Sequence, residues 1–135
     1  GLVQWWIRTT QRLAHTPIVY TPYGRRRVFI PRSRDPKTNA EQQRAAIAFV
    51  PQSTAADHIN SALVAIEKRL INITDADVLL QVHDSIGGQC APEDCDIIKS
   101  IVCEEMEQPL PLHWQGHKLE VPAEFKNGIN WKECK

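Results

Sequence analysis

The chain of 135 residues is long enough for one domain with a substantial core and too short for a large multidomain enzyme. Hydrophobic residues make up 42% and charged residues 24%, which is typical of a soluble globular protein and excludes global disorder, and no apolar run approaches the length of a membrane span. The net charge of zero hides an asymmetry between the two parts of the chain. Residues 1–50 carry nine basic and two acidic side chains, whereas residues 51–135 carry the remaining seven basic and fourteen acidic ones. This division suits contact with nucleic acid on one side and cation binding on the other.

An amphipathic helix is predicted at residues 2–14, where apolar side chains recur at helical spacing, namely Leu2, Val3, Trp6, Ile7 and Leu13. Pro17 ends this helix. A hairpin is expected to follow, with strands at residues 18–21 and 25–30 joined by the turn Pro22-Tyr23-Gly24.

Three adjacent arginines, Arg25, Arg26 and Arg27, come directly after this turn. Side chains alternate between the two faces of a strand, so at most two of the three can bind one surface. A solvated run of charge is the simpler interpretation. Because a basic tail prolongs the positive charge, at Arg32, Arg34 and Lys37, we favour phosphate binding.

Two further helices are predicted on either side of Pro51, the first from about residue 40 to residue 50 and the second from Thr54 to residue 70. Thr54 is expected to cap the second helix, whose apolar face comprises Ala55, Ile59, Ala62, Leu63, Ile66 and Leu70. Arg44 and Gln52 flank the expected break, and packing alone does not account for them.

A hairpin with His83-Asp84 at its tip is predicted from residue 78 to about residue 90. The apolar run Val78–Val82 is typical of a largely buried strand. Such a strand would hold the Asp84 carboxylate on a rigid support, outside the core, where a metal ion or a substrate can reach it. The simpler alternative is that Asp84 and Ser85 form only a polar turn between two strands.

The last predicted helix has Pro92 in its first turn, and its buried face is expected to comprise Ile97, Ile98, Ile101, Val102 and Met106. Three acidic residues lie near the end of this helix, where the helix dipole does not favour negative charge. We interpret them as a solvated acidic surface, formed by Glu104, Glu105 and Glu107.

Short strands are expected at residues 112–114 and 118–121, around the turn Gln115-Gly116, and an extended segment at residues 122–135. Hairpins and helices in this order predict an α+β fold, in which helices pack on one face of an antiparallel sheet.

The four cysteines match neither paired zinc-binding spacing nor a dense disulfide framework; they are Cys90, Cys95, Cys103 and Cys134. A zinc site with His113 and His117 stays open as an alternative. We expect reduced, partly buried thiols in an intracellular protein.

Five sequence blocks together resemble the C-terminal part of the family A DNA polymerases, which include the bacterial polymerase I class and phage and organellar relatives. The blocks are Thr21–Arg27, Arg44–Ile47, Pro51–Asp57, Leu80–Asp84, and Val121-Pro122 with Gly128–Trp131. They follow the order of the family and cover essentially the whole chain.

The resemblance implies that residues 1–135 form the C-terminal part of a polymerase palm subdomain, acting in template-directed DNA synthesis from dNTP onto a primer 3′-hydroxyl. Asp84 would be one of two aspartates that hold two Mg²⁺ ions, because charge develops on both the attacking and the leaving oxygen. His83 would lie beside the primer end. Arg44 and Gln52 would contact the minor groove, and a basic turn would hold the DNA backbone through Arg25 and Arg26.

The chain also departs from the family pattern. Ser85 replaces a usual glutamate, Ser53 a glycine, and Ala48 an asparagine that contacts DNA. The second metal-binding aspartate and the nucleotide-binding fingers helix lie outside this chain, which also lacks an initiator Met. We therefore expect a fragment or a subunit that needs the remaining polymerase segment as a partner, together with primer-template DNA and dNTP, and no membrane.

Two alternatives remain at this point. The first is a non-catalytic nucleic-acid-binding module that retains the palm scaffold. The second is a structural domain that depends on zinc. The expected location is intracellular, with the cytoplasm of a bacterium or a virus-infected cell favoured and an organelle left open.

Overall fold

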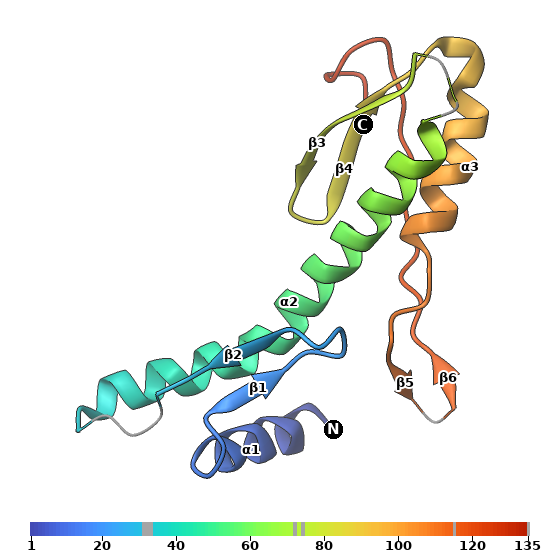
Figure 1. The fold of residues 1–135 in the computed structure, drawn as a ribbon. Helices are drawn as coiled ribbons and strands as arrows, with labels where there is room; N and C mark the ends of the chain where they lie inside the picture. The colour runs from blue at the N-terminus through green and yellow to red at the C-terminus, as the bar shows by residue number, and fades with distance from the viewer. Residues whose placement is uncertain (31–33, 72, 74, 115, 135) are drawn as a thin grey trace. The chain divides into compact units, whose positions relative to one another are not determined.

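The computed structural model describes residues 1–30, 34–71, 73, 75–114 and 116–134, and it confirms the α+β class (Figure 1). The helices and strands are α1 (Leu2–Leu13), β1 (Ile18–Tyr20), β2 (Arg26–Val28), α2 (Pro36–Leu70), β3 (Asp77–Val82), β4 (Ser85–Gln89), the 3₁₀-helix η1 (Pro92–Asp94), α3 (Cys95–Met106), β5 (His113–Trp114) and β6 (His117–Lys118). Within the described residues the strands pair as three separate two-stranded antiparallel sheets, β1–β2, β3–β4 and β5–β6.

The chain divides into two compact units, residues Gly1–Ala55 and Ala56–Lys135, and α2 runs from the first into the second. Each unit has its own small core. Among the described helices, none combines the length and the apolar character needed to cross a membrane.

The first unit is built around two phenylalanines that meet edge to face. Phe29 follows β2 and Phe49 lies on α2, with their ring centroids 5.9 Å apart. Leu13 and Ala46 complete this core, which lies where α1, the β1–β2 hairpin and the first part of α2 meet (Figure 1).

The predicted apolar face of α1 is mostly exposed, contrary to expectation. Leu13 is buried, but the other four apolar residues of the stripe keep between 45% and 65% of their surface accessible, namely Leu2, Val3, Trp6 and Ile7. The apolar periodicity predicts the helix correctly, but burial of the stripe needs a partner surface, and of these five residues only Leu13 joins the core of the first unit.

The expected break in α2 is wrong, because the helix continues through Pro51 from Pro36 to Leu70. Its start also lies earlier than predicted. The Asp35 carboxylate accepts hydrogen bonds from the Lys37 and Thr38 backbone N–H groups at 3.1 and 3.0 Å, which caps a helix whose first residue is proline. The Thr38 hydroxyl and the Thr38 and Lys37 amides lower the pKa of Asp35.

Thr54 lies inside α2 and does not cap a second helix. Its side chain is buried, and its hydroxyl donates a hydrogen bond of 2.6 Å to the Val50 carbonyl one turn earlier. Pro51 has no N–H for the carbonyl of Ile47, so this part of α2 has a weakened backbone ladder. The Thr54 hydroxyl keeps a buried polar group satisfied there.

The second unit is held by apolar contacts between the last part of α2 and α3, which lie side by side in Figure 1. Its buried core comprises Ile66, Leu70, Ile98 and Ile101, with Val78, Ile86, Val102 and Met106 partly buried against it. One predicted core residue of α3, Ile97, is 52% exposed.

The acidic end of α3 takes part in packing rather than forming only a solvated surface. Arg69 of α2 contacts Glu105 at 2.8 Å and Glu104 at 2.9 Å. Glu105 and Glu104 raise the pKa of Arg69, and the pKa of Glu104 is lowered by Arg69 and by the Ser100 hydroxyl. The third acid, Glu107, accepts a hydrogen bond from the Ala123 backbone N–H at 2.9 Å.

The predicted C-terminal hairpin is present as β5–β6, with His113 opposite Lys118 and Trp114 opposite His117. Part of its turn, Gln115, lies outside the described residues. The same holds for Arg32 of the basic tail.

Candidate active site

The His-Asp pair forms the two-residue turn of the β3–β4 hairpin, since Val82 and Ser85 are the last paired residues on each side. His83 has a φ of 54°, in the left-handed region that favours glycine, and Asp84 does not. The Ser85 hydroxyl donates to the Val82 carbonyl at 2.8 Å, and the Gln81 side-chain amide donates to the His83 carbonyl at 2.8 Å. These hydrogen bonds hold the turn that presents Asp84.

The hairpin is less buried than predicted. Leu79 is 59% and Val82 is 49% exposed, and of the β3 residues only Val78 packs against the core. Val78 pairs with Gly88 and Leu80 with Gly87, so Leu79 is the extra residue of a β-bulge. Most of the apolar run is therefore exposed, whereas the sequence predicts a largely buried strand.

Asp84 is exposed, and in the described part of the chain no hydrogen bond or ion pair engages its carboxylate. Free carboxylate oxygens are the ligands that Mg²⁺ prefers. No group of three His, Cys, Asp or Glu side chains that could hold a metal is found among the described residues. Asp84 is therefore suited to supply one carboxylate to a metal site whose other ligands come from elsewhere, and the described residues do not form a complete metal site.

The basic turn has the hairpin geometry that the sequence predicts. Gly24 has a φ of 82°, and its N–H donates to the Thr21 carbonyl at 2.9 Å. The buried Thr21 hydroxyl accepts from the Arg25 N–H at 3.1 Å. Arg26 then opens β2 opposite Tyr20, on an exposed strand.

The two arginines on β2, Arg26 and Arg27, differ in environment, as the alternation of a strand predicts. The Arg27 guanidinium lies over the Phe29 ring, 5.0 Å from its centroid. Phe29 is 1% exposed and belongs to the core, so Arg27 is oriented by packing. Arg26 alternates to the other face of the strand, which leaves it suited to contact a partner.

Arg44 and Gln52 are both exposed and lie on the same row of α2. Eight residues separate them, which is about 12 Å along a helix, with Ala48 midway. A row of this length can follow several base pairs along a groove. Because Ala48 has no polar side chain, it leaves a gap in the row.

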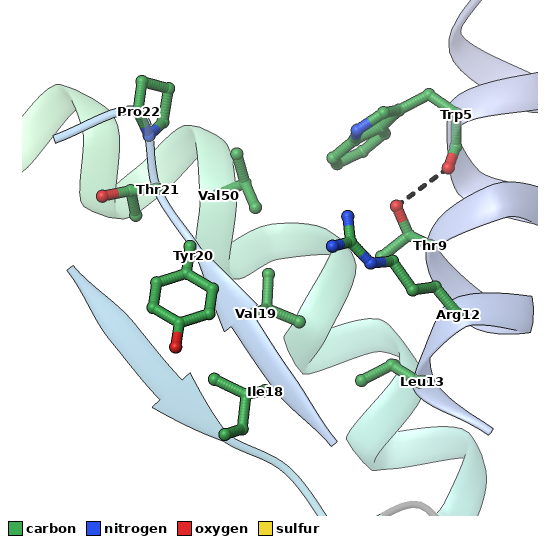
Figure 2. Close-up of a pocket in the computed structure, with 10 residues that line it drawn as sticks. All are labelled: Trp5, Thr9, Arg12, Leu13, Ile18, Val19, Tyr20, Thr21, Pro22 and Val50. Atoms are coloured by element: carbon green, nitrogen blue, oxygen red, sulfur yellow. Dashed lines mark hydrogen bonds between the residues drawn. The ribbon is translucent and has the colours of Figure 1, made fainter. Parts of the chain in front are cut away.

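A pocket of about 360 Å³ lies in the first unit between α1, β1 and Val50 of α2. Figure 2 shows Trp5 and Arg12 extending from α1 over an apolar floor that includes Val19. The pocket marks where α1 and the hairpin pack incompletely.

The four cysteines are free thiols, of which three are half-buried and Cys134 is exposed. Burial, and then the neighbouring Cys95, raise the pKa of Cys90, which favours its protonated form. His117 lies on β6, whereas the His113 side chain is outside the described part.

Comparison with known proteins gives a match to the sequence model of DNA polymerase family A over residues 1–133. DNA polymerase I from Thermus filiformis is 33% identical over 138 residues, covering 98% of this chain and 16% of that protein. DNA polymerase I from Pseudomonas aeruginosa is 32% identical over 139 residues, covering 99% of this chain and 14% of that protein. The chain belongs to DNA polymerase family A, which confirms the resemblance.

A solved structure supports the fold independently. The POL domain of Pol1 from M. smegmatis, in complex with DNA primer-template and dNTP, matches with a TM-score of 0.75 and 23% sequence identity. The match covers 81% of this chain and 20% of that one. The chain therefore spans less than a quarter of the relatives it matches.

Proposed function

We propose that residues 1–135 form the C-terminal part of the palm subdomain of a DNA polymerase. They would supply one metal-binding aspartate and the primer-template contacts of its active site. The whole enzyme would carry out template-directed DNA synthesis, transferring a nucleotide from dNTP to the primer 3′-hydroxyl. The observation that carries this proposal is the family match over residues 1–133 combined with Asp84 exposed at the apex of a hairpin. The relatives named DNA polymerase I and the neighbour with bound primer-template and dNTP support it.

Asp84 is proposed as a metal ligand. Together with an aspartate from the rest of the polymerase, it would hold two Mg²⁺ ions that stabilise negative charge on the attacking and leaving oxygens. The two-residue turn and the hydrogen bond from Ser85 to Val82 limit how far the carboxylate can move. Ser85, in place of the family glutamate, gives this turn a hydroxyl bonded to its own backbone and no second carboxylate.

The other site residues are proposed to bind and orient the primer-template. Arg25 and Arg26 would contact backbone phosphates, which fixes the position of the duplex without reading its sequence. Arg44 and Gln52 would donate hydrogen bonds to minor-groove acceptors that all base pairs share, so that they respond to base-pair shape. His83 would lie against the primer end.

The rest of the polymerase is proposed as an obligatory partner. Among the described residues no group of three potential metal ligands accompanies Asp84. Two apolar surfaces are also exposed, on α1 at Leu2, Val3, Trp6 and Ile7 and on β3 at Leu79 and Val82. Exposed apolar groups gathered on one element are typical of interaction surfaces. They fit a segment that packs against further polymerase structure.

The experiment is primer extension with the isolated chain and with the chain joined to the missing polymerase part. We expect no Mg²⁺-dependent extension by the isolated chain, and extension once the missing part is supplied. Asp84→Ala should then abolish extension while salt-dependent DNA binding persists. Extension that survives in Asp84→Ala would remove this residue from the metal site.

The alternative is a non-catalytic module that binds nucleic acid on the same scaffold. It predicts DNA binding that depends on salt and needs no metal, and no extension even when the missing part is present. Primer extension measured with the missing part present therefore distinguishes the polymerase from the non-catalytic module.

A further inference from the structure

The strand that follows Asp84 is intrinsically weak. β4 contains Gly87 and Gly88 next to each other, and glycine in a strand adds conformational freedom and no side-chain packing. The opposite strand, β3, is mostly exposed. The hairpin that presents Asp84 therefore needs support from another part of the chain.

Trp131 supplies a contact at this weak point. A Cβ atom placed on Gly87 would lie 3.0 Å from Cζ3 of the Trp131 indole and 3.2 Å from Cδ1 of Leu80, its cross-strand partner. The missing side chain of Gly87 is what lets the indole approach the strand. An aromatic ring that packs over a strand glycine restores the contact that glycine cannot make.

The C-terminal segment is folded so as to hold Trp131. Asn130 accepts from the Lys132 N–H at 3.1 Å and donates from its side-chain amide to Glu133 at 2.8 Å, and its carbonyl accepts from the Glu133 N–H at 3.0 Å. A Cβ on Gly128 would lie 2.7 Å from the Cβ of Glu133, so this turn requires glycine there. These contacts give the Gly128–Trp131 block a local structural role.

The same segment is tied to α3 at both ends of that helix. The Ala123 N–H donates to Glu107, just past the C-terminus of α3, at 2.9 Å. The Asn127 side-chain amide donates to the thiol sulfur of Cys95, the first residue of α3, at 3.0 Å. Trp131 is thus carried by a segment anchored on the helix that forms the core of this unit.

We propose that Trp131 is a positioning residue for polymerisation, which braces the β3–β4 hairpin through Gly87 and so fixes the Asp84 turn three residues away. This inference rests on the proposed metal-binding role of Asp84. Trp131 keeps 71% of its surface exposed, so the brace is a contact made by one edge of the ring. Its loss should loosen the hairpin locally and leave the core of the unit intact.

The test compares Trp131→Ala, Trp131→Phe and Ile129→Ala in the polymerase that contains this chain. Ile129 is the matched control, because it lies in the same segment and is 92% exposed. Amide hydrogen exchange at residues 82–87 measures the hairpin directly. Steady-state primer extension gives kcat and the KM for dNTP.

We expect Trp131→Ala to speed exchange in the hairpin and to lower kcat about tenfold or more, with the KM for dNTP nearly unchanged, because small displacements of a reacting group are costly. Trp131→Phe should restore most of the rate, and Ile129→Ala should behave as the unchanged enzyme. Adding Gly87→Ala should cost less in the Trp131→Ala background than alone, since the two residues share one contact.

Unchanged exchange at residues 82–87 in Trp131→Ala would overturn the brace. Equal losses of kcat in Trp131→Ala and Trp131→Phe would overturn it as well. Persistent extension by Asp84→Ala would instead refute the proposed function, and the exchange result would still stand on its own.

Discussion

The Nε2 atom of His58 lies 2.8 Å from the backbone carbonyl oxygen of Met106 and so joins the middle of α2 to the last turn of α3. A carbonyl only accepts hydrogen bonds, so Nε2 must carry the proton. His58 is 7% exposed, which makes this one of the buried polar contacts of the second unit.

Replacing His58 with alanine should therefore destabilise the chain. We expect His58→Ala to lower the free energy of unfolding by about 1–3 kcal/mol, because a buried hydrogen bond and side-chain packing are both lost. Urea unfolding followed by circular dichroism measures the change. Asn60→Ala, at an exposed position of the same helix, should change little. Equal stability of both variants would contradict the role of the hydrogen bond.

The arginines of the first hairpin should separate into binding and packing residues. Arg26→Ala should weaken DNA binding and reduce the slope of log affinity against log salt by about one. Arg27→Ala should cost about 0.5–1 kcal/mol of unfolding free energy through its contact with Phe29 and affect DNA binding less. Titrations of a short duplex at several salt concentrations, with parallel unfolding curves, distinguish the two. A larger binding defect in Arg27→Ala would reverse the assignment.

The left-handed backbone of His83 predicts opposite effects on stability and activity. His83→Gly removes the steric cost of a φ of 54°, whereas His83→Ala keeps it. The glycine variant should therefore be more stable than the alanine variant by about 1 kcal/mol. If the imidazole acts at the primer end, both variants should lose activity to a similar extent. Unfolding curves give the first comparison, and primer extension by the reconstituted polymerase gives the second. A His83→Gly variant no more stable than His83→Ala would speak against backbone strain at this turn.

The Arg69–Glu104 ion pair predicts an acid-dependent loss of stability. Arg69 and Ser100 lower the pKa of Glu104 in the folded state. The ionised Glu104 therefore contributes its full stabilisation above the pKa that this residue has in the unfolded chain, and the stabilisation is lost as the pH falls through the lowered folded-state pKa. Stability should therefore decline below a pH of about 4.3. Glu104→Gln should flatten part of this decline, and the exposed Glu120→Gln should not. Urea midpoints at a series of pH values provide the measurement.

Local patterns in the sequence were sufficient to place the hairpins. The turn after Tyr20 has a glycine that adopts a positive φ, and the alternation beyond it predicted that Arg27 and Arg26 would differ. Asp84 at the apex followed from an apolar run that ends in a polar pair. These features depend on neighbouring residues, so they can be deduced from the chain alone.

Burial and helix continuity depend on partners, and those predictions were wrong. Pro51 weakens α2 locally, but packing of Ala46 and Phe49 on one side and of Ile66 on the other stabilises the helix on both sides of it. The signal for its true start was present in Asp35 and Pro36, a capping residue followed by the residue favoured at the first helical position. Among the residues that the structure describes, nothing covers most of the apolar stripe of α1.

The roles of the candidate site residues stay predictions, and the geometry around them could be predicted only in part from the sequence. Sequence resemblance predicts roles for Asp84 and His83. The left-handed backbone of His83 has no local signature, since glycine is the usual residue for that conformation. The contact between Trp131 and Gly87 joins residues that are distant in sequence. Only the paired glycines hinted at a close approach there.

One helix serves both units of the chain, and this limits how such polymerases can be cut or recombined. The unit boundary falls between Ala55 and Ala56, inside α2. A break at that point would leave four carbonyl groups on one side and four N–H groups on the other without their helical partners. Splitting the enzyme into complementing pieces, or exchanging segments between relatives, should therefore succeed only at junctions outside residues 36–70.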